Sequence, residues 1–313
     1  MIGEIAKSLM EKGAPRSEWV AKLLETAEDP AFDGWDDCRY ELLQRVSVLA
    51  ELETEGEYYA LLDRLNDSQW ERFEDSYRQR EDKLSRYWVM RSAHGAEEAR
   101  AYLEQNVEAD ALRLLLVREK MGEGEYAEAE CLCQERVDKE QLKQWQRPSQ
   151  WQYLLYEIYQ DWGRREKQIE QARELALLGD QECYLAAKNL LLENGRWEEE
   201  YPGFLTELKK RRPAYEHMEL LKLEGETALL MEQVRLCPEM VFRYGDVLVH
   251  QYRDDVYELC ASEIRDNAKR SNNRKDYQRL CNLLRTLAKF GGTVEAKALI
   301  SEFQQTYPRR PAL

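Results

Sequence analysis

Two glycines stand close together in the stretch KMGEGEYAEAECL (120–132), in front of an acidic run with helical character. A glycine-rich turn at a helix N-terminus can hold a phosphate group through its backbone N–H groups, usually with a nearby lysine and a strand that leads in. Here the segment that leads in, ALRLLLVREK (111–120), is helical, Glu123 and Glu125 would repel a phosphate group, and no GK[ST] ending follows. The stretch therefore predicts a corner between two helices and no phosphate-binding loop.

Cys131 and Cys133 form a CxC pair, which raises the question of a metal site. Positions i and i+2 of an α-helix diverge by about 200°, so the two thiolates cannot easily face one ion. No histidine stands nearby in the sequence, and we expect packed or partly exposed thiols with no bound metal. The chain has seven cysteines without regular spacing, which indicates reduced thiols in a cytoplasmic protein.

The other residues that could do chemistry form no recognisable constellation. His94, His217 and His250 stand apart, and no nucleophile elbow or HExxH motif accompanies them. Carboxylate pairs are abundant, but in an acidic helical surface they are usually hydrated or paired with Lys or Arg. We therefore expect no catalytic residue, no cofactor and no enzyme activity. An enzyme site assembled across distant helices, with a histidine beside a Cys, Ser or carboxylate, stays open as an alternative.

Composition excludes further classes of function. Of 313 residues, 46 are basic and 61 are acidic, which gives a net charge of −15 and disfavours general binding to nucleic acids or anionic membranes. No run approaches the roughly 18 apolar residues of a membrane span. The N-terminal MIGEIAKSLMEKG (1–13) lacks the basic start and apolar block of a signal peptide. We expect a soluble, cytoplasmic protein.

Helical periodicity dominates the chain. In YELLQRVSVLAELE (40–53), the apolar residues follow the i, i+3, i+4, i+7 spacing of an amphipathic helix. Similar stripes recur later, whereas no apolar alternation is bounded by hairpin turn residues. The sequence predicts an all-α fold.

Glycines recur between these helical stretches at separations of 39, 29, 39, 32, 30 and 66 residues, and 66 is close to twice 33. Glycine enters the left-handed backbone region freely and suits the corner of a helical hairpin. The predicted corners are Gly56, Gly95, Gly124, Gly163, Gly195, Gly225 and Gly291.

Side chains recur at matching distances after some of these glycines. Tyr58, Tyr126 and Trp197 lie two residues beyond a corner, Ala129 and Ala296 lie five beyond, and Pro308 closes the last unit. This pattern resembles the tetratricopeptide (TPR) repeat of 34 residues, although several units keep only part of it. The resemblance implies an α-α superhelix, a TPR-like right-handed solenoid of about eight or nine helical hairpins. An irregular helical bundle with incidental glycines remains the alternative.

The domain organisation follows from breaks in the pattern. A basic cluster and Pro213 in LKKRRPAYEH (208–217) separate a helical-repeat array at 1–212 from a C-terminal helical segment at 213–313. We expect the two parts to be continuous. A second break lies in the polar stretch NAKRSNNRKDY (267–277).

The stretch 277–313, from YQRLCNLL to YPRRPAL, resembles the C-terminal helical region of bacterial proteins that carry a SWIM zinc finger. The shared features are a Tyr-led helix, a Gly corner, a short second helix and the YPRRPAL ending. The resemblance covers little more than a tenth of the chain. The CxCx(n)HxH motif of that family is absent, so zinc binding does not carry over. The resemblance implies a relative without the finger, or a piece of a longer protein, which the ending at Leu313 favours.

The last part of the chain is basic. From residue 252 onward there are 12 basic and 8 acidic residues. Two interpretations stay open: a solvated face, or a docking site for a partner protein or a nucleic-acid backbone. Tyr257 and Tyr277 are the only aromatic residues near the cluster, which weakens a stacking platform for single strands. The basic patch comprises Arg265, Lys269, Arg270, Arg274, Lys275 and Arg279.

These observations favour a non-catalytic helical-repeat scaffold that binds a peptide, a partner protein or another domain along a concave surface. In such an array the first helix of each hairpin lines the inner curve. Engagement of nucleic acid by the basic segment is the second hypothesis. The residues on presumed first helices that we expect to contact a partner are Arg86, Arg113, Arg118, Tyr153, Tyr156 and Lys188.

Overall fold

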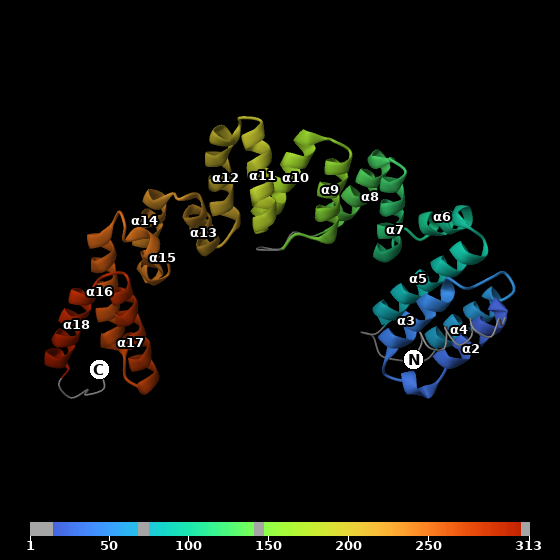
Figure 1. Ribbon diagram of the computed structural model, residues 1–313, viewed down its shortest axis with the longest axis horizontal. Coiled ribbons are helices and arrows are strands. Elements are labelled where there is room, and N and C mark those ends of the chain that lie inside the picture. Colours follow the sequence, from blue (N-terminus) through green and yellow to red (C-terminus); the bar gives the residue numbers. More distant parts are fainter. Residues whose placement is uncertain (1–14, 68–74, 141–146, 308–313) are drawn as a thin grey trace. The chain divides into compact units, whose positions relative to one another are not determined.

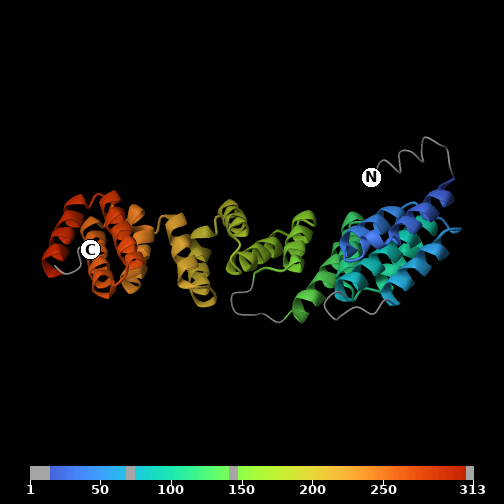
Figure 2. The same cartoon turned by 90° about the horizontal axis from the view of Figure 1, so that it is seen from below.

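The computed structural model describes residues 15–67, 75–140 and 147–307, coloured along the chain in Figure 1 and seen from below in Figure 2. The N-terminal stretch 1–13 and Pro308, which the sequence singled out, lie outside these ranges. The chain divides into two compact units: unit 1 comprises Met1–Gln141 and Ser149–Gln171, and unit 2 comprises Leu142–Pro148 and Ala172–Leu313.

Unit 1 is built from helices joined by short connections. Its α-helices are α2 (Arg16–Ala27), α3 (Asp36–Ser47), α4 (Glu55–Asp67), α5 (Asp75–Ala93), α6 (Ala96–Gln105), α7 (Asp110–Gly122), α8 (Tyr126–Lys139), α9 (Gln150–Asp161) and the first half of α10 (Arg165–Leu177), with the 3-10 turn η1 at Pro30–Phe32.

Unit 2 continues from the second half of α10. Its further helices are α11 (Gln181–Glu193), α12 (Trp197–Arg211), α13 (Ala214–Glu224), α14 (Thr227–Leu236), α15 (Val241–Leu248), α16 (Arg253–Arg270), α17 (Arg274–Lys289) and α18 (Thr293–Thr306), with the 3-10 turn η2 at Pro238–Met240.

The predicted all-α class is confirmed. The described residues form seventeen α-helices and contain no strand. Within the same residues, every helix is too short or too polar to cross a lipid bilayer. A right-handed superhelix of about eight or nine helical hairpins stays a prediction.

Six of the seven predicted glycine corners have the left-handed backbone that the prediction requires, with φ between 66° and 101°. They connect α5 to α6, α7 to α8, α9 to α10, α11 to α12, α13 to α14 and α17 to α18. The prediction for Gly56 is wrong, because α4 begins at Glu55 and Gly56 lies in its first helical turn. The six confirmed corners are Gly95, Gly124, Gly163, Gly195, Gly225 and Gly291.

Each unit is held together by apolar side chains shared between successive helices. In unit 1, one cluster joins α2 to α5, a second joins α5 to α7, and a third joins α7 to α9. In unit 2, one continuous cluster runs from Met218 on α13 to Phe303 on α18. Burial of one face of each helix against its neighbours is the main source of stability in such a chain of hairpins.

The expected seam near Pro213 is a packed junction inside unit 2, and the two units divide within α10 instead. Arg212 follows α12, and its buried guanidinium donates hydrogen bonds to Glu216 of α13 at 2.6 and 2.8 Å. The same guanidinium lies against Gly179, where an added Cβ would come within 2.7 Å of Nη2. These contacts tie α12, α13 and the α10–α11 connection to one another.

Ion pairs recur between helices that stand two positions apart in the chain. Arg118 of α7 pairs with Glu157 of α9, Lys188 of α11 with Glu224 of α13, and Arg265 of α16 with Glu302 of α18. The sequence separations within these pairs are 39, 36 and 37 residues. Two further pairs, Lys167 with Glu130 and Arg211 with Glu174, are each separated by 37 residues. In these two pairs the acidic residue comes first in the chain. Such a recurring interval is what successive hairpins of similar length produce.

Candidate partner-binding site

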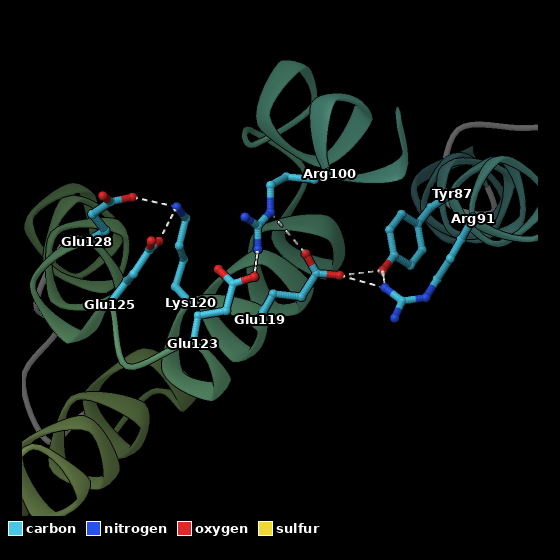
Figure 3. A network of polar contacts seen from close by, with 8 residues as sticks. All are labelled: Tyr87, Arg91, Arg100, Glu119, Lys120, Glu123, Glu125 and Glu128. Carbon is cyan, nitrogen blue, oxygen red and sulfur yellow. Dashed lines mark hydrogen bonds and ion pairs between the residues drawn. The ribbon is translucent and has the colours of Figure 1, made fainter. Parts of the chain in front are cut away.

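The glycine stretch at 120–132 is a helix corner, as predicted. Gly124 has a φ of 79° between α7 and α8. The Lys120 ammonium lies 2.6 Å from the carboxylates of both Glu125 and Glu128, as Figure 3 shows. Hydrogen bonding to Glu125 and Glu128 raises the pKa of Lys120 above its usual value. Lys120 and the acidic residues beside the corner therefore form ion pairs with one another within the fold.

Glu119 stands at the centre of the polar network beside this corner (Figure 3). Its carboxylate accepts hydrogen bonds from the Tyr87 hydroxyl at 2.9 Å and from Arg91 at 2.7 Å, both on α5. Arg100 of α6 lies 3.7 Å from the same carboxylate and also contacts Glu123. One side chain of α7 thereby links three successive helices.

We expect Glu119→Gln to lower the free energy of unfolding of unit 1 by about 1–2 kcal/mol, because charge-assisted hydrogen bonds to two helices weaken. Urea unfolding followed by circular dichroism measures this difference. Glu123→Gln is the matched control, since the pair of Glu123 with Arg100 lies at the surface, and it should cost less than about 0.5 kcal/mol. Equal losses for the two variants would contradict a central role for Glu119.

The cysteine pair behaves as the spacing predicts. Cys133 is buried and Cys131 is exposed, so the two thiols point to different environments. Burial raises the pKa of Cys133 to about 12, and its thiol stays protonated. No group of three or more His, Cys, Asp or Glu side chains suited to a metal ion occurs among the described residues.

The three histidines lie in different parts of the fold. His94 contacts Glu55 at 2.6 Å, His250 is exposed, and His217 is buried in α13. Burial, followed by the charge of Lys209, lowers the pKa of His217.

Three of the cations expected to contact a partner are engaged within the array. Arg86 pairs with Asp82 at 3.0 Å and with Asp63 at 2.5 Å. Arg118 and Lys188 form the alternate-helix pairs described above. These side chains hold neighbouring helices together, so contact with a partner would compete with those pairs.

Arg113 requires a correction, because it is only 1% exposed and cannot contact a partner in this fold. Its Nε donates to the Val107 carbonyl at 2.9 Å, and its Nη1 donates to the Leu132 carbonyl at 2.8 Å. Nη1 also lies 3.2 Å from the Glu135 carboxylate. The guanidinium thus donates hydrogen bonds to one backbone carbonyl of the α6–α7 connection and to one of α8.

Tyr153 and Tyr156 lie on the outer part of α9. Tyr153 is about one-third exposed, and Tyr156 is half-buried with its hydroxyl accepting a hydrogen bond from Gln168 at 3.4 Å. The structure brings these two tyrosines together on one helix. Lys188 belongs to unit 2.

A hollow in unit 2, lined by residues of several helices, was not predicted. We call it the α10–α13 groove; its volume is about 710 Å³. Tyr215 and Leu223 of α13 line this groove and are 44% and 46% exposed, so both offer apolar surface to a ligand. Its lining residues are Arg147, Ala176, Gly179, Asp180, Gln181, Tyr184, Phe204, Leu208, Tyr215, Glu216, Glu219, Leu220, Lys222, Leu223 and Arg243.

The inner wall of the α10–α13 groove contains aromatic side chains. Tyr184 of α11 is buried, with its ring 5.4 Å from the Phe204 ring and 5.9 Å from the Trp197 ring. Gly179 has a φ of 94° and leaves room for Arg212 behind the groove. Local periodicity gives no indication of this groove, because its walls come from five helices.

The charges around the α10–α13 groove are largely balanced. Burial raises the pKa of Glu216, but hydrogen bonds donated by Arg212 and Tyr215 outweigh it and hold the pKa below its usual value. Glu219 accepts hydrogen bonds from Arg243 at 2.7 Å and from the Tyr244 hydroxyl at 3.0 Å. Several charged groups of the groove are therefore already paired, and its exposed apolar side chains are the main surface left for a ligand.

The predicted basic patch separates into two groups. Arg265 pairs with Glu302, and Lys269 pairs with Asp266, both at 2.9 Å, while the Arg270 side chain donates to the Asp266 carbonyl. Arg274, Lys275 and Arg279, at the start of α17, are exposed. No ion pair engages them within the described part of the chain.

Comparison with known proteins gives no relative. The chain matches no protein-family model, no curated protein and no solved structure. The resemblances to TPR repeats and to the SWIM-associated helical region therefore stay predictions, and the function has to be argued from the residues themselves.

Proposed function

We propose that this protein is a non-catalytic helical-repeat scaffold, of the TPR-like kind, that binds a segment of a partner protein in the α10–α13 groove. The observation that carries the proposal is the exposure of Tyr215 and Leu223 beside the aromatic wall of that groove. Buried aromatic and aliphatic anchors supply most of the affinity in such interfaces. The expected ligand is a peptide with one large apolar anchor residue.

Charge supports a protein ligand over a polyanion. The groove has the cations Arg147, Lys222 and Arg243 on its lining, but also Asp180, Glu216 and Glu219. A backbone of phosphates would meet both signs, whereas a peptide can place polar atoms against each. The seven free cysteines support a reducing compartment, and we propose the cytoplasm.

A displayed library of random peptides, selected against the whole protein, tests this function. The enriched peptides are then synthesised with a fluorescent label and titrated by fluorescence anisotropy. We expect Tyr215→Ala and Leu223→Asp each to raise the dissociation constant at least about tenfold, because each removes apolar contact in the groove.

The matched control is Leu236→Asp, which changes another exposed leucine, 73% exposed, at the end of α14 and away from the groove lining. This variant should bind the same peptides as the unchanged protein does. The proposal fails if selection yields no binder, or if the groove variants retain full affinity.

A further inference from the structure

The exposed side of α17 differs from every surface described so far. Five cations lie there, and we call them the α17 basic face: Arg274, Lys275, Arg279, Arg285 and Lys289. The other exposed residues of the helix are Gln278, Cys281 and Asn282, so no carboxylate shares that side. The helix's one acidic residue, Asp276, is half-buried and accepts hydrogen bonds from the Asn272 backbone and the Asn273 side chain.

The opposite side of α17 is fixed in the core of unit 2. Leu280, Leu284 and Leu287 are buried against α16 and α18, which pack directly on α17. This strongly one-sided helix cannot rotate to hide its cations without exposing its leucines. The α17 basic face is therefore a permanent feature of the surface.

The five cations have no ion pair with any described residue. Elsewhere, cations such as Arg118, Lys188 and Arg265 pair with a carboxylate on the helix two positions away. For α17, the helix two positions earlier is α15, whose one carboxylate, Asp246, lies 3.9 Å from Lys222. The described part of the chain thus supplies no carboxylate that pairs with the α17 basic face.

We propose that the α17 basic face binds an acidic helix of a partner protein, which supplies the carboxylates that alternate helices supply elsewhere in the array. The face extends for roughly 22 Å, since α-helices rise about 1.5 Å per residue from Arg274 to Lys289. Lys275 and Arg279 are spaced one turn apart, as are Arg285 and Lys289. Carboxylates at i, i+4, i+7 and i+11 of a second helix match such spacing.

A shallow, open hollow of about 770 Å³ lies along the exposed side of α17. All six of its lining residues belong to α17: Arg274, Tyr277, Gln278, Cys281, Asn282 and Arg285. Arg274 and Arg285, three helical turns apart, stand at its two ends. A ligand in the hollow would therefore meet a cation at each end and neutral polar groups between them.

Nucleic acid fits this surface less well. Single strands are held by successive aromatic rings, and the hollow offers only Tyr277, which is half-buried. A duplex is a long polyanion, and the net charge of −15 on the chain opposes its approach. A short acidic helix, by contrast, would contact only the cations of α17.

This site is separate from the α10–α13 groove, and the inference does not depend on peptide binding there. None of the groove residues lies on α17. Tyr215→Ala and Leu223→Asp, which test the groove, should leave binding at the α17 basic face unchanged. Failure of either proposal is thus distinguishable from failure of the other.

The test uses a fluorescein-labelled, alanine-based helical peptide with Glu at positions i, i+4, i+7 and i+11, titrated against the whole protein at low salt. We expect saturable binding, and at least about a tenfold loss of affinity in the double variant Arg274→Glu/Arg285→Glu. Lys209→Glu/Lys210→Glu is the matched control: it reverses two exposed lysines of α12 and changes the net charge equally. The control should bind within about twofold of the unchanged protein.

A second peptide of the same composition, with its glutamates spread around the helix, separates helix recognition from charge alone. We expect it to bind about tenfold more weakly than the one-sided peptide. Equal affinity for the two peptides would overturn the proposal, and so would equal losses in the two double variants. Tighter binding of a 20-nucleotide DNA, lost in Arg274→Glu/Arg285→Glu, would reassign the face to nucleic acid. Self-association of the unchanged protein that this variant abolishes would reassign it to a second copy.

Discussion

Arg113→Met should lower the free energy of unfolding of unit 1 by about 2–4 kcal/mol, the largest effect that we expect from one substitution. Methionine keeps the length of the side chain but removes its donors. The carbonyl groups of Val107 and Leu132 would then lose a partner where the side chain is 1% exposed. Urea unfolding measures the difference, and hydrogen exchange of the α7 and α8 amides locates it.

Arg118→Met is the matched control on the same helix. The Arg118 side chain is 51% exposed, and its ion pair with Glu157 is open to solvent. Its loss should cost less than about 1 kcal/mol, as is usual for surface pairs. If the two variants lose equal stability, Arg113 does not have the structural role that its hydrogen bonds indicate.

Gly245→Ala should destabilise unit 2 by about 2–3 kcal/mol, although alanine is the better helix former. A Cβ at this position of α15 would come within 2.5 Å of the Phe290 ring, with two further ring atoms within 3.0 Å. Phe290 follows α17 and packs on the core cluster of unit 2, so the ring has little freedom to retreat. Thermal and urea unfolding measure the loss.

Two comparisons test the cause. Adding Phe290→Leu to Gly245→Ala should recover part of the lost stability, because the shorter side chain makes room for the methyl group. Gly203→Ala in α12 should be neutral or stabilise by up to about 1 kcal/mol, since its nearest neighbour is 4.0 Å from the added atom. A destabilised Gly203→Ala, or a Gly245→Ala without loss, would contradict the steric argument.

The helical class and most of its corners were predictable because both depend on local features. Apolar spacing places the helices, and a residue with positive φ favours glycine wherever a hairpin turns. Gly56 shows the limit of this argument, because a glycine inside the first turn of α4 looks the same in sequence as a corner. Gly179 is the converse case: it has a positive φ between α10 and α11, yet it falls between the predicted corners Gly163 and Gly195 and outside their regular spacing.

The candidate sites were less predictable because they depend on partners distant in the chain. Arg113 and Arg118 are five residues apart on one amphipathic helix, and the sequence assigned them the same role. Only the packing of α7 against α8 shows that one is buried while the other is at the surface. The α10–α13 groove likewise combines side chains of separate helices, which helical periodicity does not relate.

The sequence alone therefore determined the all-helical character, six glycine corners, the absence of a phosphate-binding loop and the basic character of the last helices. Each of these follows from residues within a few turns of one another. Tertiary structure decided which cations are free, because many of the carboxylates that pair with the others lie on another helix, in several cases 35 to 39 residues away along the chain. An ion pair forms between charges that lie close in space. A cluster of like charges can therefore bind a partner only where packing brings no opposite charge beside it.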